Sequence, residues 1–337
     1  MLALVLPAAA GDSKLIGDES DGSRAVPVHL ISLLDEEGEK ILPEDKPLMP
    51  FSTRYTCSGI KCHSYEKISK GWHFNATEPN VLAGRPGQPW IFVDAATATQ
   101  IPLSYRPWPG TFRPCQIGLT SWQFVQLFGR QMPGGGAGEI ESSNPEEVIR
   151  GYVSGKLEIN CLACHNADPG QDQAEYAAQI ARQNFRWAAT AACGFALVTG
   201  SAKQMPDTFD PKMPEVLNSP ELHPPTVIYH KNIFDPKNRV LFDIVRKVPN
   251  ERCYFCHSNI DIDLDGKLLQ PWSADEDVHL AAGLNCVDCH RNGVEHNIIR
   301  GYEGEEAAST NRLAGALTCR GCHLPNQSST VPTAGRL

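Results

Sequence analysis

Five cysteine pairs, each followed directly by a histidine, constrain the fold of this chain more than any other feature of its sequence. The pairs are Cys57 and Cys62, Cys161 and Cys164, Cys253 and Cys256, Cys286 and Cys289, and Cys319 and Cys322. We number them motifs 1 to 5 in chain order. Motifs 2 to 5 read C-x-x-C-H, whereas motif 1 has four residues between its cysteines. The five motif histidines are His63, His165, His257, His290 and His323.

The C-x-x-C-H pattern is the attachment signature of c-type haem. Two thiols form thioether bonds to one porphyrin, and the adjacent histidine binds the iron as its proximal ligand. With 11 histidines in 337 residues, four such hits would arise by chance roughly once in a million. Zinc ribbons, thioredoxin-like pairs and disulfides also use paired cysteines, but none of them requires histidine directly after each pair. Motifs 2 to 5 therefore predict covalent haem.

Motif 1 departs from the pattern and leaves two interpretations, an attachment site or a disulfide beside an unrelated histidine. With its motifs the chain resembles multihaem c-type cytochromes, in which C-x4-C-H also occurs, notably in the small tetrahaem cytochromes of sulfate reducers. The resemblance covers the five motifs and their flanks and not the stretches between them. It implies five covalently attached haem c groups.

Six histidines remain for the distal faces of the haems, where five bis-histidine irons need five ligands. The distal candidates are His73, His279, His296, His230 and His29. His29 has the weakest local context of these, and His223 is set aside because two prolines stiffen the backbone after it. The segment around His73 resembles distal-ligand segments of this superfamily. The run from His279 to His296 resembles haem segments of octahaem tetrathionate reductases.

Two cysteines and one acidic loop lie outside the motifs. Cys115 and Cys193 favour a structural disulfide or two inert thiols, with thiolate ligation of an iron as the alternative. Residues 261–266 match the first half of a calcium loop, but Trp272 replaces the glutamate of its twelfth position. An acidic turn is favoured there, and Ca²⁺ held in another geometry stays open.

Local patterns predict a mainly α fold with much irregular structure, low strand content and a core built around covalent haems. The expected elements are helices at 145–155, 172–193, 273–282 and 309–317, and a strand over Trp90–Val93. Asn144 and Pro145 mark one helix start, and Gly194 marks a helix end.

The motif positions divide the chain into four regions. These are an N-terminal arm at 1–50, a first-haem region with a long haem-free insertion at 51–160, a second-haem region at 161–252, and three closely spaced haems at 253–337. The insertion is rich in Gly, Pro and aromatic residues. We expect its aromatic side chains to pack against haem faces or one another, with a protein-docking surface as the alternative.

Composition and compartment limit the partners. The net charge of −9 argues against nucleic acid, and no apolar run is long enough to span a bilayer. Bacterial haem c is attached outside the cytoplasmic membrane, so the protein is expected to be exported, periplasmic or otherwise extracytoplasmic, with membrane association left open. The short apolar run at 1–10 is consistent with a signal or anchor remnant.

The leading functional hypothesis is an electron-transfer protein, because bis-histidine haems have no open position for a substrate. The main alternative is an oxidoreductase that acts on a small nitrogen or sulfur oxyanion through one open-coordinate haem. Pentahaem nitrite reductases carry lysine in place of one motif histidine, and no C-x-x-C-K occurs here. The third hypothesis is a cytochrome subunit of a respiratory complex or filament. The expected partners are redox donor and acceptor proteins, a membrane quinol-oxidising complex or other cytochromes.

Overall fold

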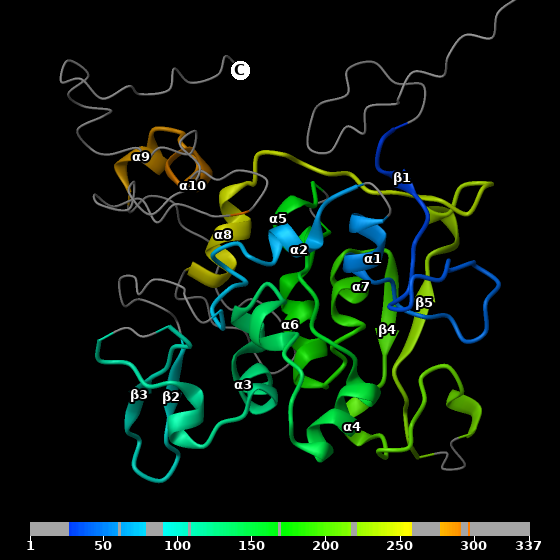
Figure 1. Ribbon diagram of the computed structural model, residues 1–337. Helices are drawn as coiled ribbons and strands as arrows, with labels where there is room; N and C mark the ends of the chain where they lie inside the picture. The colour runs from blue at the N-terminus through cyan, green and yellow to red at the C-terminus, as the bar shows by residue number, and fades with distance from the viewer. Residues whose placement is uncertain are drawn as a thin grey trace, which may run out of the picture.

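Short helices, long loops and three small antiparallel strand pairs make up the part of the chain that the structure describes (Figure 1). The structure is a computed structural model and describes residues 27–59, 62–78, 90–106, 109–167, 170–216, 221–257, 277–290 and 296. The α-helices are α1 (Thr53–Ser58), α2 (Tyr65–Ile68), α3 (Ser121–Phe128), α4 (Pro145–Ser154), α5 (Leu162–His165), α6 (Gln173–Ala181), α7 (Ala188–Ala192), α8 (Asn250–His257), α9 (Val278–Ala281) and α10 (Cys286–Cys289).

The strands pair as three two-stranded sheets. They are β1 (Leu30–Ile31) with β6 (Val240–Leu241), β2 (Ile91–Val93) with β3 (Gln100–Pro102), and β4 (Ala196–Thr199) with β5 (Thr226–Tyr229). Short 3₁₀ turns lie at Pro114–Ile117, Gly129–Gln131, Gly136–Gly138, Ala202–Gln204, Pro214–Val216 and Lys231–Ile233. The strand expected over Trp90–Val93 is confirmed as β2, one residue shorter.

The helix predicted at 145–155 is confirmed as α4. Asn144 accepts a hydrogen bond from the backbone N–H of Glu146 at 3.1 Å, and Pro145 occupies the first helical position. Two glutamates in the first turn favour this helix end electrostatically. The same residues that predicted the helix therefore begin it.

The single helix predicted from 172 to 193 is wrong, because the structure has two helices there, α6 and α7. Gln183 between them adopts a left-handed backbone with φ of 61°. Asn184 next to it donates from Nδ2 to Gln179 Oε1 at 2.7 Å and to the carbonyl of Gly200 at 3.0 Å. The buried side chain of Asn184 therefore stabilises the break between α6 and α7. Gly194 follows the end of α7 with a left-handed φ of 77°, so it marks a helix end as expected.

Residues 27–50, expected as part of an N-terminal arm, instead belong to the folded core. Strand β1 pairs with β6, with Leu30 opposite Leu241 and Ile31 opposite Val240. Leu33 is fully buried and Ile41 is 3% exposed. This segment therefore fixes the backbone that carries His29.

The haem-free insertion folds around its own aromatic side chains. Phe124 is fully buried, and its ring packs against Trp90, Tyr105 and Phe128 with centroids 5.2, 5.0 and 4.9 Å apart. These distances are typical of favourable aromatic pairs. The expectation that the aromatics pack on one another is confirmed for this cluster, whereas Trp108 lies outside the described residues.

The motif-bearing helices follow one another along one side of the molecule. In Figure 1, α1 lies right of the middle above α7, and α5, α8 and α10 follow in that order towards the upper left. Motifs 1 and 2 are built into the core, because Thr53 and Leu162 are each 1% exposed. In contrast, α8, α9 and α10 contain no buried residue. Motif 5, the acidic loop at 261–272 and the helix expected at 309–317 lie outside the described residues.

Candidate haem-binding site

Each regular motif in the described part of the chain forms about one helical turn. Residues at positions i, i+3 and i+4 share a helix face, so both cysteines and the histidine of a C-x-x-C-H motif come to one side. In motif 2 the N–H of His165 donates to the carbonyl of Cys161 at 3.0 Å, and in motif 4 His290 donates to Cys286 at 2.9 Å. The local helix thus brings two thiols and an imidazole to one side, where they could hold a single planar group.

Motif 1 has two more residues between its cysteines, but its histidine makes the same backbone hydrogen bond to its first cysteine. The N–H of His63 donates to the carbonyl of Cys57 at 3.2 Å, as the equivalent residues do in motifs 2 and 4. The N–H of Cys62 donates to Gly59 at 2.7 Å, which forms a tight turn inside the motif. Cys57 and Cys62 are free thiols in the structure rather than a disulfide. The longer spacing therefore keeps the histidine in the same relation to the first cysteine.

Neighbouring motifs contact one another in chain order. The thiol of Cys57 in motif 1 lies close enough to that of Cys161 in motif 2 to raise its pKa. Helices α8 and α10 pack together and join motif 3 to motif 4, and the N–H of Cys286 donates to Oδ1 of Asn250 at 2.7 Å. Helices α5 and α8 pack together and join motif 2 to motif 3. Motifs 1 to 4 thus form a continuous row.

Three motif histidines each face a histidine from a distant part of the chain. The pairs are His63 with His29, His257 with His73, and His165 with His296, with ring centroids 6.4, 6.1 and 6.0 Å apart. Their interplanar angles are 8°, 68° and 78°. Every pair combines one motif histidine with one of the distal candidates.

This spacing fits two imidazoles on opposite faces of one iron. Two metal–nitrogen bonds of about 2 Å, with ~1.2 Å from each nitrogen to its ring centre, place such centroids roughly 6.4 Å apart. Aromatic pairs in general span about 4.5–7 Å, so the distance alone does not distinguish the two cases. Each of the three pairs combines a motif histidine with a non-motif histidine, which is the pairing that bis-histidine ligation would require.

The structure changes the ranking of the distal candidates. His29, ranked weakest from its sequence context, lies against His63, since the β1–β6 pairing brings it there. His230 and His223 are exposed, and neither has a ring contact with a described motif histidine. His279 is half-exposed, and its Nδ1 lies 3.2 Å from the carboxylate of Asp277.

A second layer of hydrogen bonds orients His165. Its Nδ1–H donates to the carbonyl of Val245 at 2.9 Å, and the N–H of Val245 donates back to the carbonyl of His165 at 2.8 Å. The N–H of Ala167 also donates to Asp243 at 2.8 Å. Because Nδ1 carries the proton, the lone pair lies on Nε2, which is the usual arrangement in metal-binding histidines.

The backbone of His296 rests directly on Gly71. The N–H of Trp72 donates to the carbonyl of His296 at 3.2 Å. A Cβ atom at position 71 would lie 2.6 Å from that carbonyl oxygen and 2.8 Å from the Cβ of His296. Glycine at position 71 therefore permits the approach that places His296 opposite His165.

The side chain of His73 is exposed, and it lies near His257, Arg106 and His296. Desolvation, followed by the charges of His257 and Arg106, lowers the pKa of His73 to about 4. The ring is therefore neutral at neutral pH, which is the form that binds a metal.

The motif thiols are poorly suited to thiol–disulfide chemistry. Partial removal from solvent raises the pKa of Cys164 to about 11 and the pKa values of Cys253 and Cys256 to about 12. Redox-active C-x-x-C pairs need a lowered pKa so that a thiolate forms. In this chain the pKa values of these three thiols are raised instead.

Cys115 and Cys193 are separate free thiols, so the disulfide that the sequence allowed between them is absent. Cys193 is fully buried, and its Sγ donates to the carbonyl of Thr190 at 3.3 Å. Cys115 is exposed. Among the described residues, no three His, Cys, Asp or Glu side chains are grouped to hold a metal ion by themselves.

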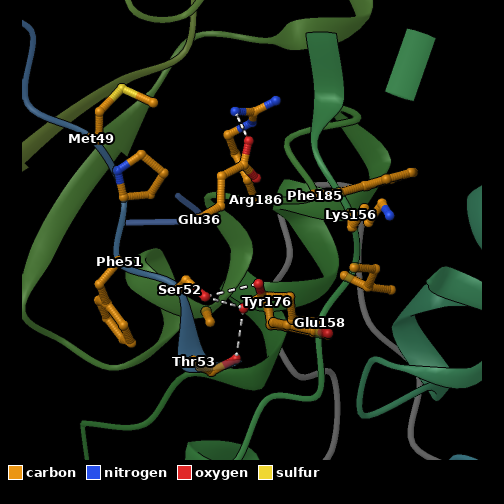
Figure 2. A pocket seen from close by; sticks show the side chains of 13 residues that line it. Glu36, Met49, Phe51, Ser52, Thr53, Lys156, Glu158, Tyr176, Phe185 and Arg186 are labelled. Carbon is orange, nitrogen blue, oxygen red and sulfur yellow. Dashed lines mark hydrogen bonds and ion pairs between the residues drawn. The ribbon is translucent and has the colours of Figure 1, made fainter. Parts of the chain in front are cut away.

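A small cavity lies between the start of α1 and the segment that precedes motif 2 (Figure 2). Its volume of about 20 Å³ suits a single water molecule rather than a substrate. Glu158 accepts hydrogen bonds there from the hydroxyls of Ser52 and Thr53, and Glu36 pairs with Arg186. These contacts connect the helix of motif 1 to the approach to motif 2.

Comparison with known proteins gives no relative: no family model, curated protein or solved structure matches this chain. In the part of the chain that the structure describes, no helix has the length and apolar character needed to cross a membrane.

Proposed function

We propose that this chain is an exported electron-transfer protein that passes single electrons along a row of covalently bound c-type haems. The observation that carries the proposal is the set of three histidine pairs, each made of a motif histidine and a histidine from elsewhere, with ring centroids 6.0–6.4 Å apart. Two axial imidazoles leave an iron without an open position, which favours electron transfer over substrate chemistry.

The proposed haem sites follow from these pairs. The haem of motif 1 is held by His63 and His29, the haem of motif 2 by His165 and His296, and the haem of motif 3 by His257 and His73. His279 remains the proposed distal ligand of motif 4, because it precedes Cys286 by seven residues and its Nδ1 lies 3.2 Å from Asp277, which favours Nε2 as the metal-binding nitrogen. Motif 5 supplies the fifth haem, and His230 remains the candidate for its distal ligand.

Each haem supplies one-electron chemistry, and the protein supplies its ligands, its surroundings and its neighbours. Contacts between successive motifs support a row in which neighbouring haems would lie next to one another. Electrons would therefore move stepwise from one end of the row to the other. The acidic net charge favours basic surfaces on redox partners.

The first test counts haems and their open positions. An alkaline pyridine haemochrome assay should give five haems per chain, whereas four would mean that motif 1 is empty. Low-temperature EPR of the oxidised protein should show only low-spin iron, and the reduced protein should not bind carbon monoxide. A high-spin signal worth one haem, with one carbon monoxide bound, would instead support an oxidoreductase.

The second test addresses the pairing. His29→Ala, His73→Ala and His296→Ala should each convert one haem from low to high spin, since each removes one axial ligand. His223→Ala is the matched control, because its side chain is exposed and it is the one histidine left over when five irons each take a distal ligand. A conversion in this control, or none in the first three variants, would contradict the proposed ligand set.

A further inference from the structure

A buried arginine from the haem-free insertion lies beside one of the three histidine pairs. Arg106 is 1% exposed, and its guanidinium stands 3.6 Å from the centroid of the Trp72 ring. Its Nη2 donates to the carbonyl of Trp72 at 2.6 Å and to Oδ1 of Asn75 at 2.9 Å. These two residues flank His73, so the cation is fixed against the turn that presents this ligand.

The insertion holds this arginine firmly in place. The N–H of Arg106 donates to Oγ of Ser104 at 2.9 Å, and the N–H of Ser104 donates to the carbonyl of Phe112 at 2.9 Å. Leu103, one residue earlier, is 1% exposed within the aromatic cluster of Phe124. An arginine keeps its charge at every accessible pH, so motif 3 has a permanent positive neighbour.

The fixed charge beside motif 1 has the opposite sign. Glu158 accepts hydrogen bonds from Ser52 Oγ at 2.8 Å, from Thr53 Oγ1 at 3.2 Å and from the N–H of Arg54 at 3.0 Å. These residues begin the helix that carries Cys57. The nearby side chain of Arg54 is exposed, so water screens its charge more strongly than it screens Arg106.

Reduction of a haem adds one negative charge. A cation in a region of low dielectric stabilises the reduced form, and a carboxylate destabilises it. We infer that Arg106 raises the reduction potential of the haem held by His257 and His73, while Glu158 lowers that of the haem at motif 1. Electrons that enter at the haem of motif 1 are then transferred favourably to the haem of motif 3. This inference rests on the proposed electron-transfer function.

The experiment follows one haem by EPR-monitored redox titration of the full-length holoprotein. The low-spin signal that disappears in His73→Ala identifies the haem of motif 3. In Arg106→Gln the midpoint of that signal should shift to lower potential while the other midpoints stay in place. Arg106→Lys keeps the charge and should shift it less, and Arg113→Gln, at an exposed position of the same insertion, should not shift it.

Glu158→Gln tests the effect on the haem of motif 1 independently. Its result does not depend on whether the Arg106 variants are stable. The signal lost in His29→Ala identifies the haem of motif 1, and its midpoint should rise in Glu158→Gln. Unchanged midpoints in Arg106→Gln and Glu158→Gln, or equal shifts in Arg106→Gln and Arg106→Lys, would overturn the inference. A chain without haem would instead overturn the proposed function, so the two failures are distinguishable.

Discussion

At the scale of single residues, Gly71 offers the sharpest test of how a distal ligand is positioned. In Gly71→Ala the new methyl group would meet the carbonyl oxygen of His296 at 2.6 Å, which no real Cβ contact tolerates. We expect His296 to move away from His165 and one haem to become high-spin, as measured by EPR and carbon monoxide binding.

Gly151→Ala is the matched control for this prediction. Gly151 lies within α4, and a Cβ atom there meets nothing within 4 Å. Alanine is also the better helix former, so this variant should be as stable as the wild type or slightly more stable. If Gly71→Ala keeps a fully low-spin spectrum, His296 is not an axial ligand.

The sequence identified the candidate ligands but could not pair them. C-x-x-C-H is a local pattern, and helical spacing brings its three side chains to one face. A distal ligand has no such pattern: His73 and its partner His257 are 184 positions apart. His29 lies directly before β1, whose partner β6 is about 210 positions away, and neighbouring residues do not encode such a pairing.

At the scale of elements, the start of α1 should affect stability more than the start of α2. Ser52 is buried, accepts from the N–H of Tyr55 at 3.0 Å and donates to Glu158 at 2.8 Å. Ser64 is an exposed cap whose hydrogen bond to the N–H of Lys67 is 3.3 Å long.

We therefore expect Ser52→Ala to lower the free energy of unfolding by about 1–2 kcal/mol and Ser64→Ala by only ~0.5 kcal/mol. Urea denaturation followed by circular dichroism measures both changes. Equal losses in the two variants would mean that the buried link from Ser52 to Glu158 contributes nothing to stability.

Local signals predicted elements where no distant contact competed with them. Asn144 and Pro145 start α4 as expected. Between α6 and α7 an Ala-rich sequence favours one helix, but the side chain of Asn184 reaches the carbonyl of Gly200, and the left-handed Gln183 breaks the helix. A tertiary hydrogen bond thus overrides helix propensity.

At the scale of the whole molecule, burial of Glu36 links stability to pH. Burial raises its pKa above the ordinary value of 4.5, although Arg186 opposes the shift. The folded state then binds more protons than the unfolded state, so this residue makes the folded protein less stable as the pH rises above 4.5.

Glu36→Gln removes this dependence, because glutamine resembles the protonated acid. Urea midpoints of wild type and variant should be closest near pH ~5, and the wild type should fall relative to the variant towards pH ~7. A constant difference between the two proteins across this range would exclude the proposed linkage.

Differences in burial along the chain separate a part that has its own apolar core from a part that lacks one. The described apolar core lies between Leu33 and Phe242, and it includes the starts of the helices of motifs 1 and 2. Helices α8, α9 and α10 contain no buried residue, although they carry motifs 3 and 4. Short helices without an apolar core are unstable alone in water, so we expect haem to supply the missing core here.

Limited proteolysis of the full-length Cys253→Ser/Cys256→Ser variant tests this dependence. Loss of the motif 3 haem should make the chain after about residue 250 sensitive to protease, while a fragment that contains α1 to β6 resists digestion. Cys57→Ser/Cys62→Ser is the control, because motif 1 rests on the core and α8 should stay protected. Protection of the C-terminal region in the motif 3 variant would show that the polypeptide, and not haem, holds this part of the molecule together.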